Sequence, residues 1–196
     1  MTTTTTKKRT TTRRKTTPQK VVELPPNPFI FEILDLANSQ RTKDKRIETL
    51  QKYENNALKT IFIWNFDETV ISMLPEGPVP YGEINDQNVY SGDLSDNLSK
   101  EASGGESATG QDLDGRGRVS LRREYQNLYH FVKGGNDGLT TIRREMMFIN
   151  LLQGLHPKEA EILILTKDKR LQEQYSKITF DVVKESYSDI QWGGRS

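Results

Sequence analysis

Residues 138–167 carry the strongest core-forming pattern in the chain and predict two apolar helices joined at Gly154. In the first of them apolar residues recur at spacings of three and four, which predicts one buried face. That face consists of Ile142, Met146, Ile149 and Leu152, widened by Met147 and Phe148. We expect Gly154 to close this helix in a left-handed conformation, and Pro157 suits the first turn of the next helix. The pattern constrains folding and by itself specifies no chemistry.

Shorter apolar patterns on both sides of this pair predict further helices, and nothing between them resembles a strand or an internal repeat. The first has Asn27 as a suitable N-cap and Pro28 as a suitable first residue. The fold class is therefore predicted to be all-α. The predicted helices cover 27–38, 42–53, 57–66, 119–133, 169–175 and 179–187.

Composition sets the domain organisation, because a chain with 33% apolar and 28% charged residues and a mean hydropathy of −0.73 cannot bury all of itself. Residues 1–24 form a basic, Thr-rich, low-complexity tail and linker, of which we expect residues 1–20 to be disordered in isolation. Residues 81–117 form an acidic, Gly- and Ser-rich insertion that we expect to be flexible. The two halves of one helical domain are then 25–80 and 118–196.

Several classes of protein and site are excluded by what the sequence lacks. The absence of Cys removes disulfides, thiolate nucleophiles and Cys-based zinc sites. No apolar run approaches the roughly 18 residues that span a bilayer, so no contact with a membrane is expected. The basic N-terminal residues lack the apolar stretch of a secretory signal.

No catalytic or metal-binding arrangement emerges from the sequence. Neither a Walker A sequence nor a strand-flanked GxGxxG is present. A calcium loop starting at Asp112 fails because Arg116 and Arg123 fall where oxygen ligands are required. Asp67 and Glu68 are adjacent in sequence and should point to different sides. We therefore expect no enzymatic activity, no cofactor and no metal.

Two histidines remain as candidates for acid–base chemistry. His130 falls on the apolar face of a predicted helix, and His156 precedes Pro157 at a helix start. Neither has an acidic partner at helical spacing. A satisfied core or helix-end histidine is therefore favoured over a general base.

Charge is unevenly distributed along the chain, with seven Lys or Arg residues and one acidic residue in positions 1–24. Such a tail can neutralise about six phosphates, which predicts salt-sensitive binding to DNA or RNA. It contains no aromatic residue on which a base could stack. A tail lying along a protein shell would have the same composition.

Arginines near the end of the acidic insertion form a second candidate group. The alternative for Arg122 and Arg123, as for Arg143 and Arg144, is a solvated helix face paired with Glu124 and Glu145. The candidate nucleic-acid-binding residues are Lys7, Lys8, Arg9, Arg13, Arg14, Lys15, Lys20, Arg116, Arg118, Arg122 and Arg123.

The two tryptophans are candidates for contact with a protein partner. Trp64 is large enough to serve either the core or a partner, and its position in the pattern does not decide between them. Trp192 lies in the closing DIQWGGRS, where it either docks back on the core or anchors a partner.

Some segments resemble a family of uncharacterised proteins encoded by T4-like cyanophages (marine myoviruses). These segments are LPEG (74–77), LRREYQNLYHF (121–131), IRREMMFINLLQGLHPKEAEILILTKDKRL (142–171) and the closing IQWGGRS. The resemblance covers most of 27–196 and excludes the basic tail and the acidic insertion. It implies a phage protein made in a bacterial cytoplasm and implies nothing about activity.

Two functions are consistent with these features. The first is a non-enzymatic adaptor in phage nucleic-acid metabolism, whose tail contacts DNA or RNA and whose helical body contacts a phage or host protein. The second is a virion or head-assembly protein whose N-terminal arm runs along neighbouring subunits. The opposite charges of the tail and the insertion also suggest the hypothesis that the insertion masks the tail.

Overall fold

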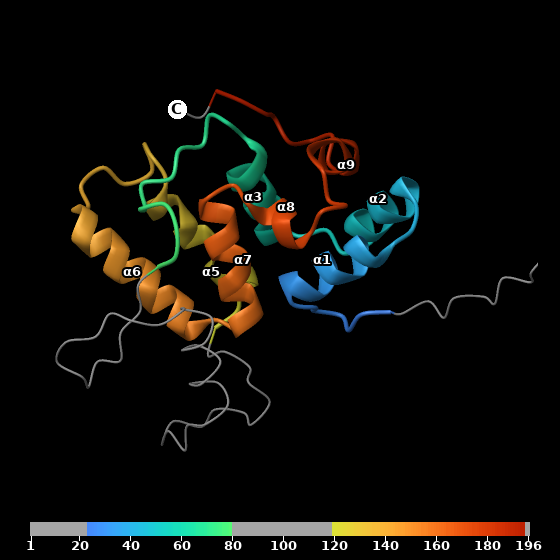
Figure 1. Ribbon diagram of the computed structural model, residues 1–196, viewed down its shortest axis with the longest axis horizontal. Coiled ribbons are helices and arrows are strands. Elements are labelled where there is room, and N and C mark those ends of the chain that lie inside the picture. Colours follow the sequence, from blue (N-terminus) through green and yellow to red (C-terminus); the bar gives the residue numbers. More distant parts are fainter. Residues whose placement is uncertain (1–22, 80–118, 195–196) are drawn as a thin grey trace, which may run out of the picture.

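The computed structural model describes residues 23–79 and 119–194, which form a helical body (Figure 1). These residues contain no strand, only an isolated antiparallel bridge between Ser72 and Val132, so the all-α class is confirmed for this part of the chain. The basic residues up to Lys20 and the acidic insertion 81–117 lie outside the described residues. The helices are α1 (Ile30–Ser39), α2 (Lys43–Lys52), α3 (Asn56–Phe66), α5 (Leu121–Glu124), the 3₁₀ helix η1 (Tyr125–Phe131), α6 (Thr141–Gly154), α7 (Pro157–Lys167), α8 (Leu171–Gln174) and α9 (Phe180–Ser186).

Helix α7 is the centre of the packing and contacts α1, α3, α6 and α8. Helix α2 packs on α1 and α9 at one end of the body, and α6 lies at the opposite edge in Figure 1. The side chains of Leu58, Ile61 and Leu163 have no exposed surface where α3 meets α7. The second helix of the central pair is therefore a core element, as its apolar composition predicts.

Side-chain caps fix the starts of α2 and α3 close to their predicted positions. Thr42 Oγ1 accepts a hydrogen bond from the amide of Lys45 at 3.4 Å, and Asn55 Oδ1 accepts one from the amide of Leu58 at 2.8 Å. Short polar side chains that satisfy the first free amides of a helix are strong start signals. These boundaries follow from local chemistry and were accessible from sequence.

The start of α1 was predicted incorrectly. The helix begins at Ile30, two residues after the expected Pro28, and Asn27 is an exposed residue outside it. The first amide that needs a partner is that of Phe29, which donates to Glu32 Oε2 at 2.8 Å. A glutamate three residues into the helix thus does the capping that we expected from Asn27.

The predicted helix over 119–133 is in fact a short α-helix, α5, followed by the 3₁₀ helix η1. Because a 3₁₀ helix repeats every three residues, Leu128 and Phe131 lie on the same side and are both buried. Tyr129, which follows Leu128 in the sequence, is 49% exposed. The sequence thus predicted a helix at the correct place, but it predicted one α-helix where the chain forms a short α-helix and a 3₁₀ helix.

Gly154 closes α6 for a different reason from the one expected. It does not adopt a left-handed φ. Instead its carbonyl accepts a hydrogen bond from the amide of Val119 at 3.0 Å, and a Cβ at Gly154 would lie 3.0 Å from Val119 Cγ2. The glycine permits close approach of the chain entering α5. Pro157 is in the first turn of α7, as predicted.

Candidate functional site

A loop between α3 and α5 is held against α7 by charged residues that are almost entirely buried. The side chain of Lys167 is 1% exposed, and its Nζ donates to the carbonyls of Pro75 (2.9 Å) and Gly77 (2.7 Å) and to Asp168 Oδ1 (2.7 Å). Asp168 Oδ2 accepts from the amide of Gly77 at 3.2 Å. All three donors of the ammonium group are thus used. This arrangement fixes the LPEG segment in place and leaves Lys167 no donor for a substrate.

The start of the same loop is fixed by a second set of polar contacts. Lys169 Nζ donates to the carbonyl of Asp67 at 3.0 Å and to Glu68 Oε2 at 3.2 Å. The Asp67 carboxylate is buried, and its Oδ2 accepts from the amide of Gly193 at 2.9 Å. Asp67 and Glu68 point to different environments, as expected from sequence, since the Glu68 side chain is 89% exposed. Asp67 therefore ties the end of α3 to the C-terminal segment.

A small apolar cavity of about 50 Å³ lies where this loop meets α6. Its walls come from the LPEG segment and the residues after it, and from one side of α6. Lys167 and Glu145 contribute the charged groups at the cavity. The lining residues are Leu74, Pro75, Pro78, Val79, Glu145, Phe148, Ile149 and Lys167.

Next to this cavity α6 presents apolar side chains to solvent. Ile142 is 73% exposed and Met146 is 59% exposed, and both lie on the helix face that includes the half-buried Ile149. We call Ile142, Met146 and Ile149 the α6 outer face. The sequence pattern assigned these residues to the core, and for Ile142 and Met146 that prediction is wrong. The buried side of α6 is instead formed by Arg144, Phe148 and Leu152.

Arg144 was predicted to lie on the polar side of α6, and this is also wrong. The residue is 3% exposed, and its guanidinium donates to backbone carbonyls. Nε donates to His130 O at 2.9 Å, and Nη2 donates to Asn136 O at 2.9 Å and to Leu139 O at 3.4 Å. Arg144 thus holds η1 and the following turn against α6. Arg143, its neighbour, is exposed as expected.

Both histidines have structural partners. His130 Nδ1 lies 3.0 Å from Asn136 Nδ2. His156 is the N-cap of α7, where Nδ1 accepts from the amide of Lys158 at 3.2 Å. Burial, together with the nearby charge of Lys158, lowers the pKa of His156 below its ordinary value of 6.5. The position of His156 matches the helix-end alternative.

The described candidate nucleic-acid residues, Arg122 and Arg123, differ in environment. Arg122 is half-buried and its Nη2 donates to the carbonyl of Pro28 at 3.0 Å, whereas Arg123 is exposed. The other candidates, which lie outside the described residues, are Lys7, Lys8, Arg9, Arg13, Arg14, Lys15, Lys20, Arg116 and Arg118.

The two tryptophans both lie against the body. Trp64 is 2% exposed and stacks on Phe131 with ring centroids 6.5 Å apart, which places it in the core and not on a surface open to a partner. Trp192 is half-buried and meets the ring of Phe180 edge-on at 4.9 Å. Trp192 thus docks back on the body, one of the two alternatives left open by its sequence position.

Residues 23–79 and 119–194 contain neither a membrane-spanning helix nor a cluster of metal-ligating side chains. None of the helices there combines the length and apolar character needed to cross a bilayer. The same residues contain no group of three His, Asp or Glu side chains that could hold a metal ion.

Comparison with known proteins gives one match. No curated protein and no solved structure matches the chain. Residues 33–104 and 108–173 match the family described as "Family of unknown function (DUF6433)". The matched ranges include most of the acidic segment 81–117, and they end before the closing IQWGGRS. Since the match spans more than half of the sequence, the chain belongs to this family of unknown function, DUF6433.

Proposed function

We propose that the protein is a non-enzymatic phage adaptor whose helical body binds a phage or host protein and whose basic tail contacts DNA or RNA. The observation that supports protein binding most directly is the α6 outer face. Contiguous apolar patches on the surface of soluble proteins often mark interaction sites. The resemblance of LPEG and of 142–171 to cyanophage proteins supports a phage origin and work in the bacterial cytoplasm.

The α6 outer face has the properties of an anchoring surface. Fully burying an aliphatic side chain contributes about 1.5–3 kcal/mol, so covering Ile142 and Met146 would supply a useful part of a binding energy. The cavity beside Ile149 is large enough for a small apolar group from a partner. Its walls are held by Lys167 and Asp168, so it would exist before the partner arrives. Preformed pockets that receive an apolar side chain are typical of interface hot spots.

The Lys167–Asp168 pair beside the cavity supports contact and not reaction. Lys167 has a full set of acceptors, and Asp168 accepts from the amide of Gly77 as well as from Lys167. Groups committed in this way hold backbone in place and are poorly suited to moving protons.

Capture of partners from infected cells tests the proposal. The full-length chain, immobilised, is expected to retain a specific protein after nuclease treatment. The variant Ile142→Ser/Met146→Ser is expected to lose that protein while keeping the wild-type unfolding curve. The matched control, Arg143→Ser/Asn150→Ser, changes two exposed polar residues of the same helix and should retain it. If the apolar variant captured the same protein as well as the wild type, the α6 outer face would not be the docking surface.

The alternative, a virion or head-assembly protein with an extended N-terminal arm, makes a separate prediction. Mass spectrometry of purified particles would then find the protein in many copies. For the adaptor, the protein is expected in infected cells and absent from purified particles.

A further inference from the structure

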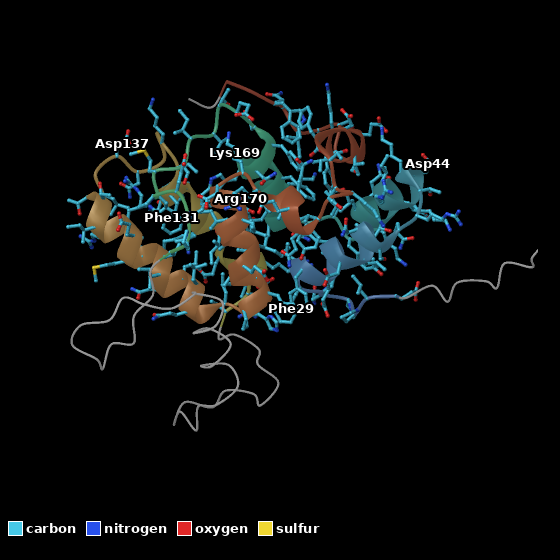
Figure 2. All side chains as sticks on the ribbon, in the orientation of Figure 1. Phe29, Asp44, Phe131, Asp137, Lys169 and Arg170 are labelled. Atoms are coloured by element: carbon cyan, nitrogen blue, oxygen red, sulfur yellow. The ribbon has the colours of Figure 1, made fainter. Side chains whose placement is uncertain are left out.

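The loop after α3 contains a short segment that pairs with the chain after η1. Ser72 and Val132 form an antiparallel bridge at its centre. Figure 2 shows this region at the upper left of the body, between the labelled Phe131 and Asp137. We call residues 71–73 the bridge segment. The hydrogen bonds that flank the bridge run from Met73 N to Phe131 O (2.8 Å) and from Lys133 N to Ile71 O (2.9 Å).

The bridge segment uses one of its two hydrogen-bonding edges. Successive residues of an antiparallel strand point their N–H and C=O groups to opposite sides. Since Ile71 O and Met73 N both face the chain after η1, the N–H and C=O of Ser72 face away from it. No described residue donates to the Ser72 carbonyl or accepts from its amide. This edge therefore offers one donor and one acceptor to a further strand.

The outer edge of the opposing segment is already used. Val132 N donates to Tyr129 O at 3.4 Å, and the Val132 carbonyl accepts from Gly135 N at 3.2 Å. These local turns occupy the groups that would extend the ladder on that side. Of the two outer edges in the described structure, a further strand thus finds an open one only at the bridge segment.

Burial alternates along 70–74 as in a strand with one face on the core. Val70 and Leu74 are buried, whereas Ile71 and Met73 between them are 44% and 38% exposed. Alternate side chains of a strand lie on opposite faces. The exposed face therefore places two apolar side chains beside an open backbone edge. Extended peptides that bind by β-augmentation use this combination.

A cation lies on the same face as Ile71. Lys133 is opposite Ile71 in the ladder, which puts their side chains on one face, and Lys133 is exposed. It forms no salt bridge with any residue of 23–79 or 119–194. Strands lie about 4.8 Å apart, so a strand added beside Ile71 would lie about 10 Å from Lys133. A lysine and a glutamate side chain together span that distance.

The other face of the ladder adjoins a hollow of about 240 Å³. Its walls include Val70 and Val132, and two glycines on its rim carry no side chain that would fill it. Since a cavity of about 150 Å³ holds a benzene ring, this hollow accepts one large apolar side chain. The lining residues are Val70, Val132, Lys133, Gly134 and Gly135.

We propose that the bridge segment is a docking edge for an extended peptide of a protein partner, in which an acidic residue is next to a large apolar one. The peptide backbone pairs with Ser72, the acidic side chain meets Lys133, and the apolar neighbour points to the opposite face and enters the hollow. A helical partner would leave the Ser72 groups unused, because a helix satisfies its own backbone. This site is separate from the α6 outer face and does not rest on it.

Hydrogen exchange of the full-length chain, followed by NMR, tests this with defined peptides. The probe is the capped octapeptide TTVEFTVT, and the reference peptide has Gln in place of Glu. At saturation the Glu peptide is expected to slow exchange of the Ser72 amide about tenfold, because that amide gains a hydrogen bond. The Met73 amide, already bonded to Phe131 O, is the internal control and should change little.

Variants separate the backbone contact from the side-chain contacts. Ser72→Pro removes the outward N–H and keeps both ladder hydrogen bonds, and Pro is tolerated on edge strands. It is expected to bind the Glu peptide about tenfold more weakly, whereas the matched control Ser72→Ala should bind like the wild type. The wild type should prefer the Glu peptide about threefold, and Lys133→Met should lose that preference.

The outcomes decide the proposal even if Ser72→Pro does not fold, because the amide exchange is measured on the wild type. Absence of peptide binding, or binding that leaves the exchange of the Ser72 amide unchanged, overturns the docking edge. Equal affinity for the two peptides contradicts the contact with Lys133. Ile142→Ser/Met146→Ser should bind the Glu peptide like the wild type. A loss of binding in that variant would place the peptide on the α6 outer face and overturn the edge, while the adaptor proposal would stand.

Discussion

The carboxylate of Glu159 and the backbone amide of Leu121 form a buried hydrogen bond of 2.8 Å between α7 and the first residue of α5. The other carboxylate oxygen accepts from the amide of Ile30, the first residue of α1, at 3.1 Å. One side chain therefore joins the starts of two helices to a third. Burial raises the pKa of this carboxyl above its ordinary value, while the two backbone hydrogen bonds and the charge of Arg122 act in the opposite direction.

Replacing Glu159 with Gln is expected to destabilise the fold. The amide side chain has one acceptor oxygen where the carboxylate has two, so one buried backbone N–H is left without a partner. Such a loss costs about 1–3 kcal/mol. Urea unfolding measures it, with Glu161→Gln on the same helix as the control. Equal stability of the two variants would contradict the role assigned to Glu159.

His156 is expected to make stability depend on pH. Because its pKa is lowered in the folded state, the unfolded chain binds a proton first as the pH falls from about 6.5. The folded protein therefore loses stability as the pH falls through this window, and the loss stops growing below the folded-state pKa. His156→Asn should show less loss between pH 7 and pH 5. His130 is present in both chains, so parallel curves of unfolding free energy against pH would show that His156 is not responsible.

Removing the Lys167 ammonium is expected to release the LPEG segment. Lys167→Met leaves two carbonyls and the Asp168 carboxylate without their donor, and breaking a buried ion pair in this way costs about 3–5 kcal/mol. Hydrogen exchange should report faster exchange of the Gly77 amide, which donates to Asp168. Lys169→Met, at a side chain that is 28% exposed, should cost less. A larger loss of unfolding free energy in Lys169→Met than in Lys167→Met would contradict the role assigned to Lys167.

Replacing Arg144 should destabilise the fold, whereas replacing its neighbour Arg143 should have little effect on stability. Arg144→Met leaves carbonyls of η1 and the following turn without a donor, and each unsatisfied buried group costs about 1–3 kcal/mol. Arg143→Met changes an exposed side chain and should stay within about 0.5 kcal/mol of the wild type. Thermal or urea unfolding of both variants decides this, and similar stabilities would place Arg144 at the surface.

Local chemistry was sufficient to predict several elements. The starts of α2, α3 and α7 were predicted to within a residue, and in the structure each depends on neighbours in sequence: Thr42 and Asn55 cap α2 and α3, and Pro157 is in the first turn of α7. Helix α6 was located correctly and oriented wrongly. Met146, Met147, Phe148 and Ile149 are consecutive, so helical periodicity permits more than one apolar face. Packing on η1 and α7 selects the face with Phe148.

The remaining features depend on residues far apart in the chain. Glu159 has the sequence context of a solvent-exposed acid in the first turn of a helix, and its partners Ile30 and Leu121 lie 129 and 38 residues away. The stacked rings of Phe31 and His156 likewise join α1 to the start of α7, 125 residues further along the chain. No periodicity or local motif reports such contacts, and only the folded chain brings them together.

The proposed contact between the tail and nucleic acid can be tested most directly from the dependence of binding on salt. The affinity of the full-length chain for a duplex of unrelated sequence should fall with a slope of about −5 in log K against log salt, for about six neutralised phosphates. Deleting residues 1–20 should remove this binding. A truncated chain that binds the duplex as tightly as the full chain, or a full chain whose affinity is insensitive to salt, would contradict a tail that works by neutralising phosphates.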